Sequence, residues 1–400
     1  MSAQIIVTEI QSTDPGVLAR ETTHALRREA AGLPIQGGVL FANAGTPVKE
    51  LRRELALALP GVPFLGSTSC MGVGAKGKLL VGEPALVGLF FLGEEVRFGT
   101  HTLSTNERRI VTGKTLSQKA LAKANLTGNE AHYAFFFPTP GGEEALLKGA
   151  YEELGEHTTL IGGTAADNDL SGNWWTWNED LATQGGVSIG VGTWPKRTAV
   201  SYQGGYLSTQ KKARVTRSSG RMIHELNGLP AAEVYNEWLD GALDEFLEKG
   251  GSVLGVSTLN PLGVARGQFG GVDAYVLIHP ETVIPQSKAL TTFAEIDEGE
   301  TVVLMQSTKG SLVNRGARVA KWAMNRSGLP SSKVAGGLMI YCGGCVLAIQ
   351  EETKDMLSKV GKTLDPAPWV AGFSFGEQGC VIPRKVDHGN LMASVLLFEK

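Results

Sequence analysis

Apolar residues along the chain form short runs that alternate with helical patterns. Segment 133–169 begins with the apolar run YAFFF and continues with an amphipathic stretch. In that stretch the large apolar residues recur at the spacing of one helix face, at Leu146, Leu147, Tyr151 and Leu154. A second apolar run ends in the glycine-rich turn IGGT. This order predicts a strand, a helix and a second strand.

The same order recurs in segments 38–74 and 337–379. Leu51, Leu55 and Leu59 form the helical stripe of the first copy, and the second strands end in LGST and AGFS. Further strands are expected after each unit, at 85–92 and 96–100, at 186–192 and 197–203, and at 391–398. The pattern predicts an α/β fold with mixed sheets, built from repeated β-α-β-β units whose helices cover the sheets.

A different pattern separates the second and third units. It predicts strands at 213–216 and 222–226, a helix over 228–247, and strands at 253–257, 275–278 and 301–306. The turn-rich stretch GGYLST at 204–209 stands before it. We therefore predict two domains, 1–206 and 207–400.

Composition narrows the class of protein. Glycine is frequent, with 52 of 400 residues, but it has no Gly-X-Y period, so we expect many tight turns and no collagen helix. The 37 basic and 40 acidic residues give a net charge of −3, which argues against nucleic acid or an acidic membrane surface as partner. The N-terminus does not resemble a signal peptide, and four cysteines form no disulfide framework. We expect a cytoplasmic protein with reduced thiols.

Several motifs together resemble the FIST (F-box and intracellular signal transduction) proteins. GSTSCMGVG and IGGTAADND are similar to the N-terminal FIST domain. RVTRSSGRMIHELNGLPAAEVYNEWL, LMIYCGGC and VAGFSFGEQG follow in the order of the C-terminal FIST domain. The resemblance implies a sensory module that binds small molecules such as amino acids or their derivatives. Some similar bacterial proteins bind haem and report nitric oxide, which makes a haem-based sensor a further alternative.

Two positions depart from the family pattern. Val73 stands where the family commonly has an acidic residue, and Cys345 stands where it usually has a basic one. The second departure puts an anion contact at that position in doubt. The chain shows no F-box-like segment and no kinase or cyclase, so the resemblance implies output through a protein partner, unless the protein is an enzyme.

Ligands of open α/β units bind where the carboxyl ends of strands meet. In each unit this selects the elbow after the first strand and the turn after the second. If the units pack around one centre, these loops face one pocket. The predicted ligand-binding residues are Ser67, Thr68, Cys70, Gly162, Gly163, Asp167, Asn168, Trp174, Cys342, Cys345 and Glu377.

Cys342 and Cys345 form the sharpest local motif, a C-x-x-C pair between an apolar strand and a predicted helix. The pair is a reactive nucleophile, a redox pair or half a metal site, or else two small residues in a tight turn. In the enzyme alternative, Cys342 is the nucleophile and Glu377 or Asp167 the acid/base. Because no second C-x-x-C exists, we predict no metal site.

Two other features remain open between a structural and a binding role. Asp167 either stabilises its turn or contacts a ligand. The tryptophans of SGNWWTWN, Trp174 among them, form either an aromatic wall for a ligand or part of an interface or core. The seven histidines are scattered, so the sequence selects no axial ligand for haem.

Overall fold

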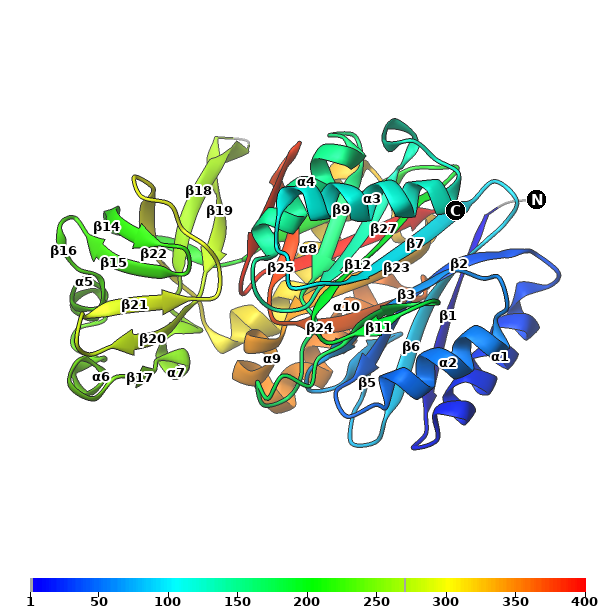
Figure 1. Ribbon diagram of the computed structural model, residues 1–400, viewed down its shortest axis with the longest axis horizontal. Coiled ribbons are helices and arrows are strands. Elements are labelled where there is room, and N and C mark those ends of the chain that lie inside the picture. The colour runs from blue at the N-terminus through cyan, green and yellow to red at the C-terminus, as the bar shows by residue number, and fades with distance from the viewer. Residues whose placement is uncertain (1–2, 270) are drawn as a thin grey trace.

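The protein contains three six-stranded mixed sheets and a larger fourth sheet, in a computed structural model that describes residues 3–269 and 271–400. The three smaller sheets and their helices form one body, which holds both chain ends at the same side (Figure 1). The fourth sheet lies at the opposite end of the molecule (Figure 1). The mixed α/β architecture predicted from the sequence is confirmed.

The three sheets of the body share one strand order. The first contains β1 (Gln4–Gln11), β6 (Ala85–Leu92), β2 (Ile35–Asn43), β3 (Phe64–Ser69), β10 (Thr176–Asn178) and β11 (Ala182–Thr183). The second contains β7 (Arg97–Ser104), β12 (Gly186–Thr193), β8 (Tyr133–Pro138), β9 (Thr159–Gly163), β25 (Glu377–Ile382) and β26 (Lys385–Gly389). The third contains β13 (Thr198–Gln203), β27 (Ala393–Glu399), β23 (Val334–Cys342), β24 (Trp369–Ser374), β4 (Val73–Ala75) and β5 (Lys78–Leu80).

Each sheet has one parallel strand pair at its centre and receives a hairpin from another part of the chain. The parallel pairs are β2–β3, β8–β9 and β23–β24, and all other neighbours are antiparallel. Hairpin β10–β11 follows β9 in the sequence but joins β3, β25–β26 follows β24 but joins β9, and β4–β5 follows β3 but joins β24. This exchange links the three sheets in a closed cycle.

Two helices cover the outer face of each sheet. They are α1 (Pro15–Ala30) and α2 (Val48–Ala58) on the first sheet, α3 (Ile110–Ala124) and α4 (Glu143–Leu154) on the second, and α8 (Lys309–Ser327) and α10 (Thr353–Leu364) on the third. Local chemistry sets their ends. The Asp14 carboxylate caps α1 by accepting a hydrogen bond from the Gly16 N–H (2.7 Å), and α8 ends at Gly328, whose φ of 63° is left-handed.

The inner faces of the three sheets meet in one apolar core. Phe91 of the first sheet lies 5.3 Å, between ring centroids, from both Tyr133 of the second and Phe398 of the third. Because helices cover the outer faces, the central strands are apolar on both sides, and every residue of β6 and β8 is buried. The packing holds the three parallel strand pairs in fixed relation to one another.

The fourth sheet lies within residues 207–269 and 271–306, which we call the inserted segment. In the sequence they lie between β13 and α8, which both belong to the body. Its strands are β14 (Leu207–Ser219), β15 (Met222–Leu226), β16 (Leu229–Pro230), β17 (Gly251–Ser252), β18 (Leu262–Phe269), β19 (Val272–Ile278), β20 (Pro280–Ile284), β21 (Ala289–Thr292) and β22 (Thr301–Gln306). The predicted division into 1–206 and 207–400 stays a prediction.

Two predicted elements of the inserted segment are wrong. The single helix expected over 228–247 is two helices, α5 (Ala231–Trp238) and α6 (Asp244–Lys249). Left-handed φ angles at Asp240 (53°) and Gly241 (86°) end the first, and the Asn236 side chain accepts the Leu243 N–H (2.7 Å). The strand expected at 253–257 contains the one-turn helix α7 (Leu254–Ser257). An apolar run this short does not distinguish a strand from a buried helical turn.

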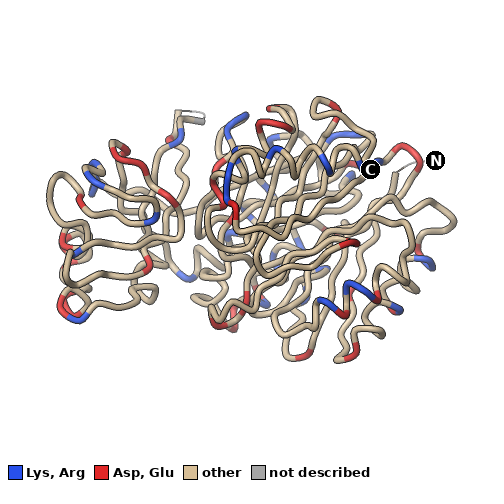
Figure 2. Tube along the Cα trace, viewed as in Figure 1, with Lys and Arg blue, Asp and Glu red and all other residues tan. Residues whose placement is uncertain are grey.

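Charged residues of both signs are interspersed in the view of Figure 2. They gather on helices, loops and the inserted segment, and are sparse along the crossing strands of the body. Of the helices within residues 3–269 and 271–400, none has both the length and the apolar character needed to cross a membrane.

Candidate functional site

The turns that follow β3, β9 and β24 lie against one another. These are the three glycine-rich turns that the sequence repeat points to. Backbone hydrogen bonds join them pairwise, from the N–H of Ala166 to Thr68 O (3.1 Å), of Cys70 to Phe373 O (3.1 Å) and of Phe375 to Thr164 O (3.1 Å). The cycle of sheets thus brings the carboxyl ends of all three parallel pairs to one place, where ligands of α/β proteins collect.

A cavity of about 420 Å³ lies at this place, between the body and the inserted segment. Its walls come from both parts, and among the predicted site residues they include Asn168, Trp174 and Cys342. The body also contributes Pro140, Glu143, Asp169, Leu170, Gly344, Leu347, Phe375 and Asn390, and the inserted segment contributes Arg221, Leu254, His279, Glu281 and Phe293. The other predicted residues, Ser67, Thr68, Cys70, Gly162, Gly163, Asp167, Cys345 and Glu377, are buried and do not form its surface.

Asn390 carries an unused hydrogen-bond donor at the cavity wall. Its side chain is 1% exposed, and its Oδ1 accepts the backbone N–H of His279 (3.2 Å). That bond fixes which end of the amide is oxygen. The Nδ2 of Asn390 has no partner among the described residues. A buried amide donor is costly to leave unpaired, so Asn390 is a candidate for a ligand contact.

His279 also lines the cavity and is neutral. Burial lowers the pKa of its imidazole to about 3. The ring Nε2 lies 3.2 Å from Thr258 Oγ1. Among the residues that the structure describes, it is the one histidine on this surface. It fits poorly as an axial ligand for haem, because that nitrogen is already hydrogen-bonded. Within the described ranges, no group of three or more His, Cys, Asp or Glu side chains is arranged to hold a metal ion.

Asp167 serves its own loop. Its carboxylate accepts the backbone N–H groups of Leu170 (2.7 Å), Gly172 (2.9 Å) and Asn173 (2.9 Å). These three bonds favour turn stabilisation among the roles open to this residue. The loop they shape carries Asn168 and Trp174 to the cavity, with the Trp174 indole edge-on to Phe375 at 6.2 Å between centroids.

The three tryptophans of this stretch divide between surface and core. Trp174 forms the aromatic wall, whereas Trp177 is fully buried in the packing beneath α1 and α2. Trp175 is half-buried, and the Lys49 ammonium lies 5.2 Å from its ring centroid. Trp177 thus takes the core role that the sequence left open for this stretch, whereas contact of Trp174 with a ligand stays a prediction.

Glu377 is buried behind the cavity wall. Its carboxyl accepts hydrogen bonds from the Ser374 hydroxyl (2.7 Å) and the Met392 backbone N–H (2.8 Å). Burial raises the pKa of this carboxyl to about 8, although both hydrogen bonds act in the opposite direction. Glu377 is therefore protonated near neutrality. Its predicted role as an acid/base stays a prediction.

The cysteines of the site differ in their protonation. Burial raises the pKa of the Cys70 thiol to about 12 and that of Cys342 well above its ordinary value. Cys70 packs so tightly on Gly343 that a Cβ at this glycine would lie 2.4 Å from the Cys70 sulfur. The pKa of Cys345 is instead lowered. Burial acts to raise it, but the Cys342 thiol and the charge of Arg315 outweigh burial and lower the pKa to about 6.

Arg221 joins the inserted segment to the body at the edge of the cavity. Its guanidinium donates to Glu143 (2.5 Å) and Glu144 (3.0 Å) at the start of α4. The Glu144 carboxylate also accepts the Glu295 backbone N–H (2.9 Å). Burial acts to lower the pKa of Arg221, but the two carboxylates outweigh it and raise the pKa. The charge of Arg221 is thus used within the protein.

The predicted site residues included neither Asn390 nor any residue of the inserted segment. Arg221 stands in the motif RVTRSSGRMIHELNGLPAAEVYNEWL without having been singled out, whereas His279, Glu281 and Phe293 lie in no motif. All four reach the cavity only through the docking of the fourth sheet. The sequence did contain a feature that could have indicated Asn390. This residue ends the polar stretch HGN, directly before the apolar run that leads into β27.

The fold and cavity define a class of α/β protein with a ligand cavity enclosed by two parts of the chain. Two family models match this chain: the FIST N domain matches residues 36–229, and the FIST C domain matches residues 231–380. The chain therefore belongs to the FIST family, as its motifs indicate. FIST domains are sensory, ligand-binding signalling domains.

Comparisons with individual proteins are more distant. An uncharacterised protein of Methanocaldococcus jannaschii is 29% identical over 128 residues, which is 32% of this chain and 24% of that protein. The chain thus spans about a quarter of the length of this curated relative.

Solved structures with some likeness include two cyanuric acid hydrolase structures. One, from A. caulinodans, is 12% identical with a TM-score of 0.29, over 50% of this chain and 71% of that chain. The other is 10% identical with a TM-score of 0.36 over the full length of both. Phosphoribosylformylglycinamidine synthase II of Thermotoga maritima is 10% identical with a TM-score of 0.25, over 99% of this chain and 72% of that chain. Similarity at this level carries no argument about the ligand.

Proposed function

We propose that this protein is a small-molecule sensor whose ligand occupies the cavity between the body and the inserted segment. The observation that carries the proposal is a cavity of about 420 Å³ lined by Asn390, whose side-chain Nδ2 has no partner among the described residues. Cavities of a few hundred Å³ that are mostly apolar and contain a few fixed polar groups are typical small-molecule sites.

The lining suggests an amino acid or a derivative of one. The Asn390 Nδ2 suits a carboxylate or carbonyl oxygen. Glu281 and Asp169 line the same cavity and suit an ammonium group. Trp174, Phe293 and Phe375 offer aromatic surface to an apolar side chain. Arg221 is not assigned to the ligand, because Glu143 and Glu144 already take its charge.

A sensor can signal that its ligand is bound only if the ligand favours one conformational state of the protein over another. A ligand in this cavity touches both parts of the chain, so it stabilises the arrangement in which the inserted segment is docked. We propose that a protein partner binds selectively to this arrangement, in the cytoplasm, a compartment that suits a chain whose four cysteines are free. The nearly balanced charge is the reason that we propose neither nucleic acid nor a membrane as partner.

The alternative of a cysteine-dependent enzyme with Glu377 or Asp167 as acid/base stays a prediction. Asp167 is used by its loop, and Glu377 does not reach the cavity surface, so neither carboxyl stands where a ligand in the cavity would meet it. The haem-based sensor has no observation in its favour, given the engaged Nε2 of His279.

A thermal-shift screen of amino acids, amines and keto acids tests the proposal. A ligand at one hundred times its Kd stabilises the native state by about 2.7 kcal/mol, which raises Tm measurably. Titration calorimetry with each hit then compares wild type with Trp174→Ala and the matched control Trp175→Ala. We expect Trp174→Ala to weaken binding about tenfold through lost aromatic contact, and Trp175→Ala to leave Kd unchanged. Equal Kd values for all three proteins would place the ligand elsewhere and refute the site.

A further inference from the structure

Arg315 is a fully buried guanidinium without a carboxylate partner. Its exposed fraction is 0%, and its Nη1 donates to the carbonyl oxygens of Gly204 (2.8 Å) and Leu391 (2.6 Å). Its Nε and Nη2 have no hydrogen-bond partner among the described residues. The guanidinium carbon lies 4.3 Å from the Tyr341 ring centroid. Neutral partners alone do not offset the cost of burying a full charge, so a counter-charge is expected nearby.

Cys345 is the neighbour to which we assign the counter-charge. Its sulfur and the Arg315 guanidinium both lie against Tyr206, whose ring centroid is 6.0 Å from the guanidinium carbon. The other titratable groups facing Cys345 are Cys342 and Tyr341 of β23, Tyr206 and Glu377. Burial raises the pKa of Tyr206, Tyr341 and Glu377, so all three are neutral at pH 7. The Tyr206 hydroxyl donates to Thr258 O (2.7 Å) and lies 3.6 Å from the Cys345 sulfur.

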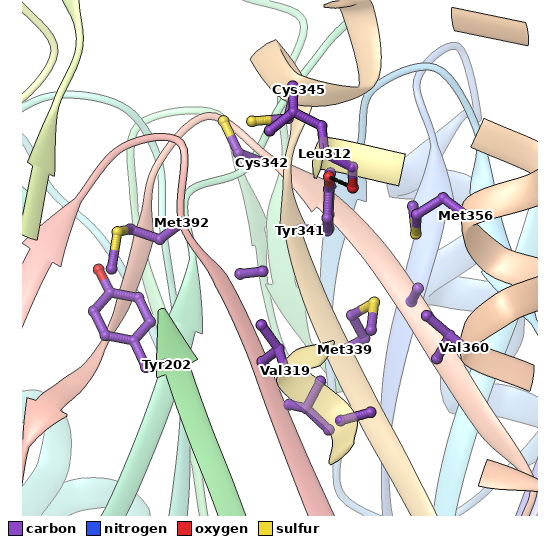
Figure 3. Packing of buried hydrophobic residues seen from close by; sticks show 14 of the residues in the cluster. Tyr202, Leu312, Val319, Met339, Tyr341, Cys342, Cys345, Met356, Val360 and Met392 are labelled. Atoms are coloured by element: carbon purple, nitrogen blue, oxygen red, sulfur yellow. Dashed lines mark hydrogen bonds between the residues drawn. The ribbon is translucent and has the colours of Figure 1, made fainter. Parts of the chain in front are cut away.

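The second thiol connects this buried charge to the cavity. Figure 3 shows the sulfur atoms of Cys342 and Cys345 beside each other at the end of β23. Cys342 is 3% exposed and lines the cavity, whereas Cys345 is 0% exposed. A small reagent in the cavity therefore meets Cys342 first, with Cys345 directly behind it.

We propose that Cys342 and Cys345 form a redox-active dithiol, in which Cys345 is a thiolate paired with Arg315 and Cys342 is the thiol that meets a hydroperoxide in the cavity. The placement of the two sulfur atoms beside each other, the unmatched charge of Arg315 and the position of Cys342 on the cavity wall carry this assignment. It does not depend on the identity of the sensed ligand.

The reaction has two steps. The Cys342 sulfur attacks the hydroperoxide ROOH, an S–O bond forms and the O–O bond breaks. The Cys342 proton passes through the Cys345 thiolate to the leaving alkoxide, which departs as ROH and leaves a sulfenic acid on Cys342. The Cys345 thiolate then attacks the Cys342 sulfur, and hydroxide leaves and takes a proton from solvent to give water. The two sulfurs are oxidised to a disulfide, and the hydroperoxide is reduced.

Oxidation has a consequence for the ligand site. The disulfide removes the negative charge from beside Arg315, which leaves a buried cation unmatched. It also changes Cys342 at the cavity wall. Oxidised protein should therefore have a lower Tm than reduced protein, and dithiothreitol should restore it.

The charge state is tested first, by the ultraviolet absorbance of the thiolate as a function of pH. Wild type should show one thiolate that titrates with a pKa of about 6, and Cys345→Ser should remove it while Cys380→Ser leaves it. In Arg315→Met, a return of the pKa to the ordinary 9.0 would lower the thiolate fraction at pH 7 about ninetyfold. If that variant fails to fold, the comparison of Cys345→Ser with Cys380→Ser still decides. A thiolate that persists in Cys345→Ser would overturn the assignment.

Oxidation is tested on the full chain with limiting tert-butyl hydroperoxide and peptide mass mapping. We expect one disulfide, between Cys342 and Cys345, while the more exposed Cys380 stays a thiol. Cys342→Ser should form no disulfide, and its Cys345 should stay unmodified because it does not reach the cavity surface. Cys345→Ser should accumulate sulfenic acid on Cys342 at least tenfold more slowly, because it lacks the thiolate that accepts the proton. Oxidation of Cys380 ahead of the pair, or equal rates in wild type and Cys345→Ser, would refute the proposal.

Discussion

Glu377→Gln should make the protein more stable at neutral pH. Glu377 is 0% exposed, and burial raises the pKa of its carboxyl from 4.5 to about 8. Below pH 4.5 the folded and unfolded carboxyls are both protonated, so the carboxyl adds no pH dependence there. As pH rises from 4.5 towards 8, the unfolded chain loses the proton while the folded chain keeps it. The unfolding free energy of wild type therefore falls over this window.

The size of the effect follows from the two pKa values. Their difference corresponds to about 5 kcal/mol once both states are ionised, and to about 3 kcal/mol at pH 7. Glutamine is neutral and has the same shape. Its amide can accept the Met392 N–H and donate to the Ser374 oxygen, so the two hydrogen bonds of Glu377 are retained.

Urea denaturation of wild type and Glu377→Gln at pH 5, 6, 7 and 8 measures this effect. The variant should gain on wild type by about 1.4 kcal/mol for each pH unit across the window. The exposed Glu351→Gln serves as the control and should show no such trend. A difference between Glu377→Gln and wild type that stays constant with pH would mean that Glu377 is ionised in the folded protein, and the reasoning from burial would be refuted.

Three further predictions concern stability and docking. Asp167→Ala removes the acceptor of three loop N–H groups and should lower the free energy of unfolding by roughly 2–3 kcal/mol. Thermal melting measures this loss, and the exposed Asp169→Ala should show almost none. Gly149→Ala should lower the free energy of unfolding by roughly 1–3 kcal/mol, because its Cβ would lie 1.9 Å from the Ile110 carbonyl oxygen where α4 crosses α3. In the control Gly310→Ala the new Cβ meets nothing within 4 Å, so Tm should stay unchanged. Arg221→Met should cost roughly 2–3 kcal/mol and speed proteolysis of the inserted segment, because it leaves the buried Glu143 unpaired; an unchanged cleavage rate would show that Arg221 does not hold the segment in place.

Much of the body could be predicted from local patterns. The stripe of Leu51 and Leu55 and that of Leu146, Leu147 and Leu154 lie on the buried faces of α2 and α4, because an apolar helix face has to meet a sheet. The cyclic exchange of hairpins could not be predicted. It pairs β10 with β3 and β25 with β9 across more than one hundred residues, and no periodicity in either partner records which strand the other will meet.

The meeting of the three turns could be predicted from the repeat, but the direction of their side chains could not. The turns after β3, β9 and β24 meet as the repeat suggests, yet Phe375 lines the cavity while Ser374 and Glu377 point into the protein and bond to each other. A turn reverses the direction of successive side chains in a way that its letters do not reveal. Asp167 and Asn168 divide in the same manner, the first serving the loop and the second lining the cavity.

The charge state of the C-x-x-C pair could not be predicted from the motif alone, although the sequence contains a second feature that bears on it. The motif alone left a nucleophile, a redox pair, half a metal site and a tight turn open, and the charge that we propose for this pair depends on Arg315, which lies 30 positions before Cys345 on α8. The sequence does hold a sign of this. Arg315 falls on the apolar stripe of its own helix, three residues after Leu312 and four before Val319, both buried. A cation at such a position must be buried when the helix packs, and a buried cation requires an anion. Because β23 packs beneath α8, the C-x-x-C at the end of this strand brings a thiol to Arg315, and the two motifs are best interpreted together.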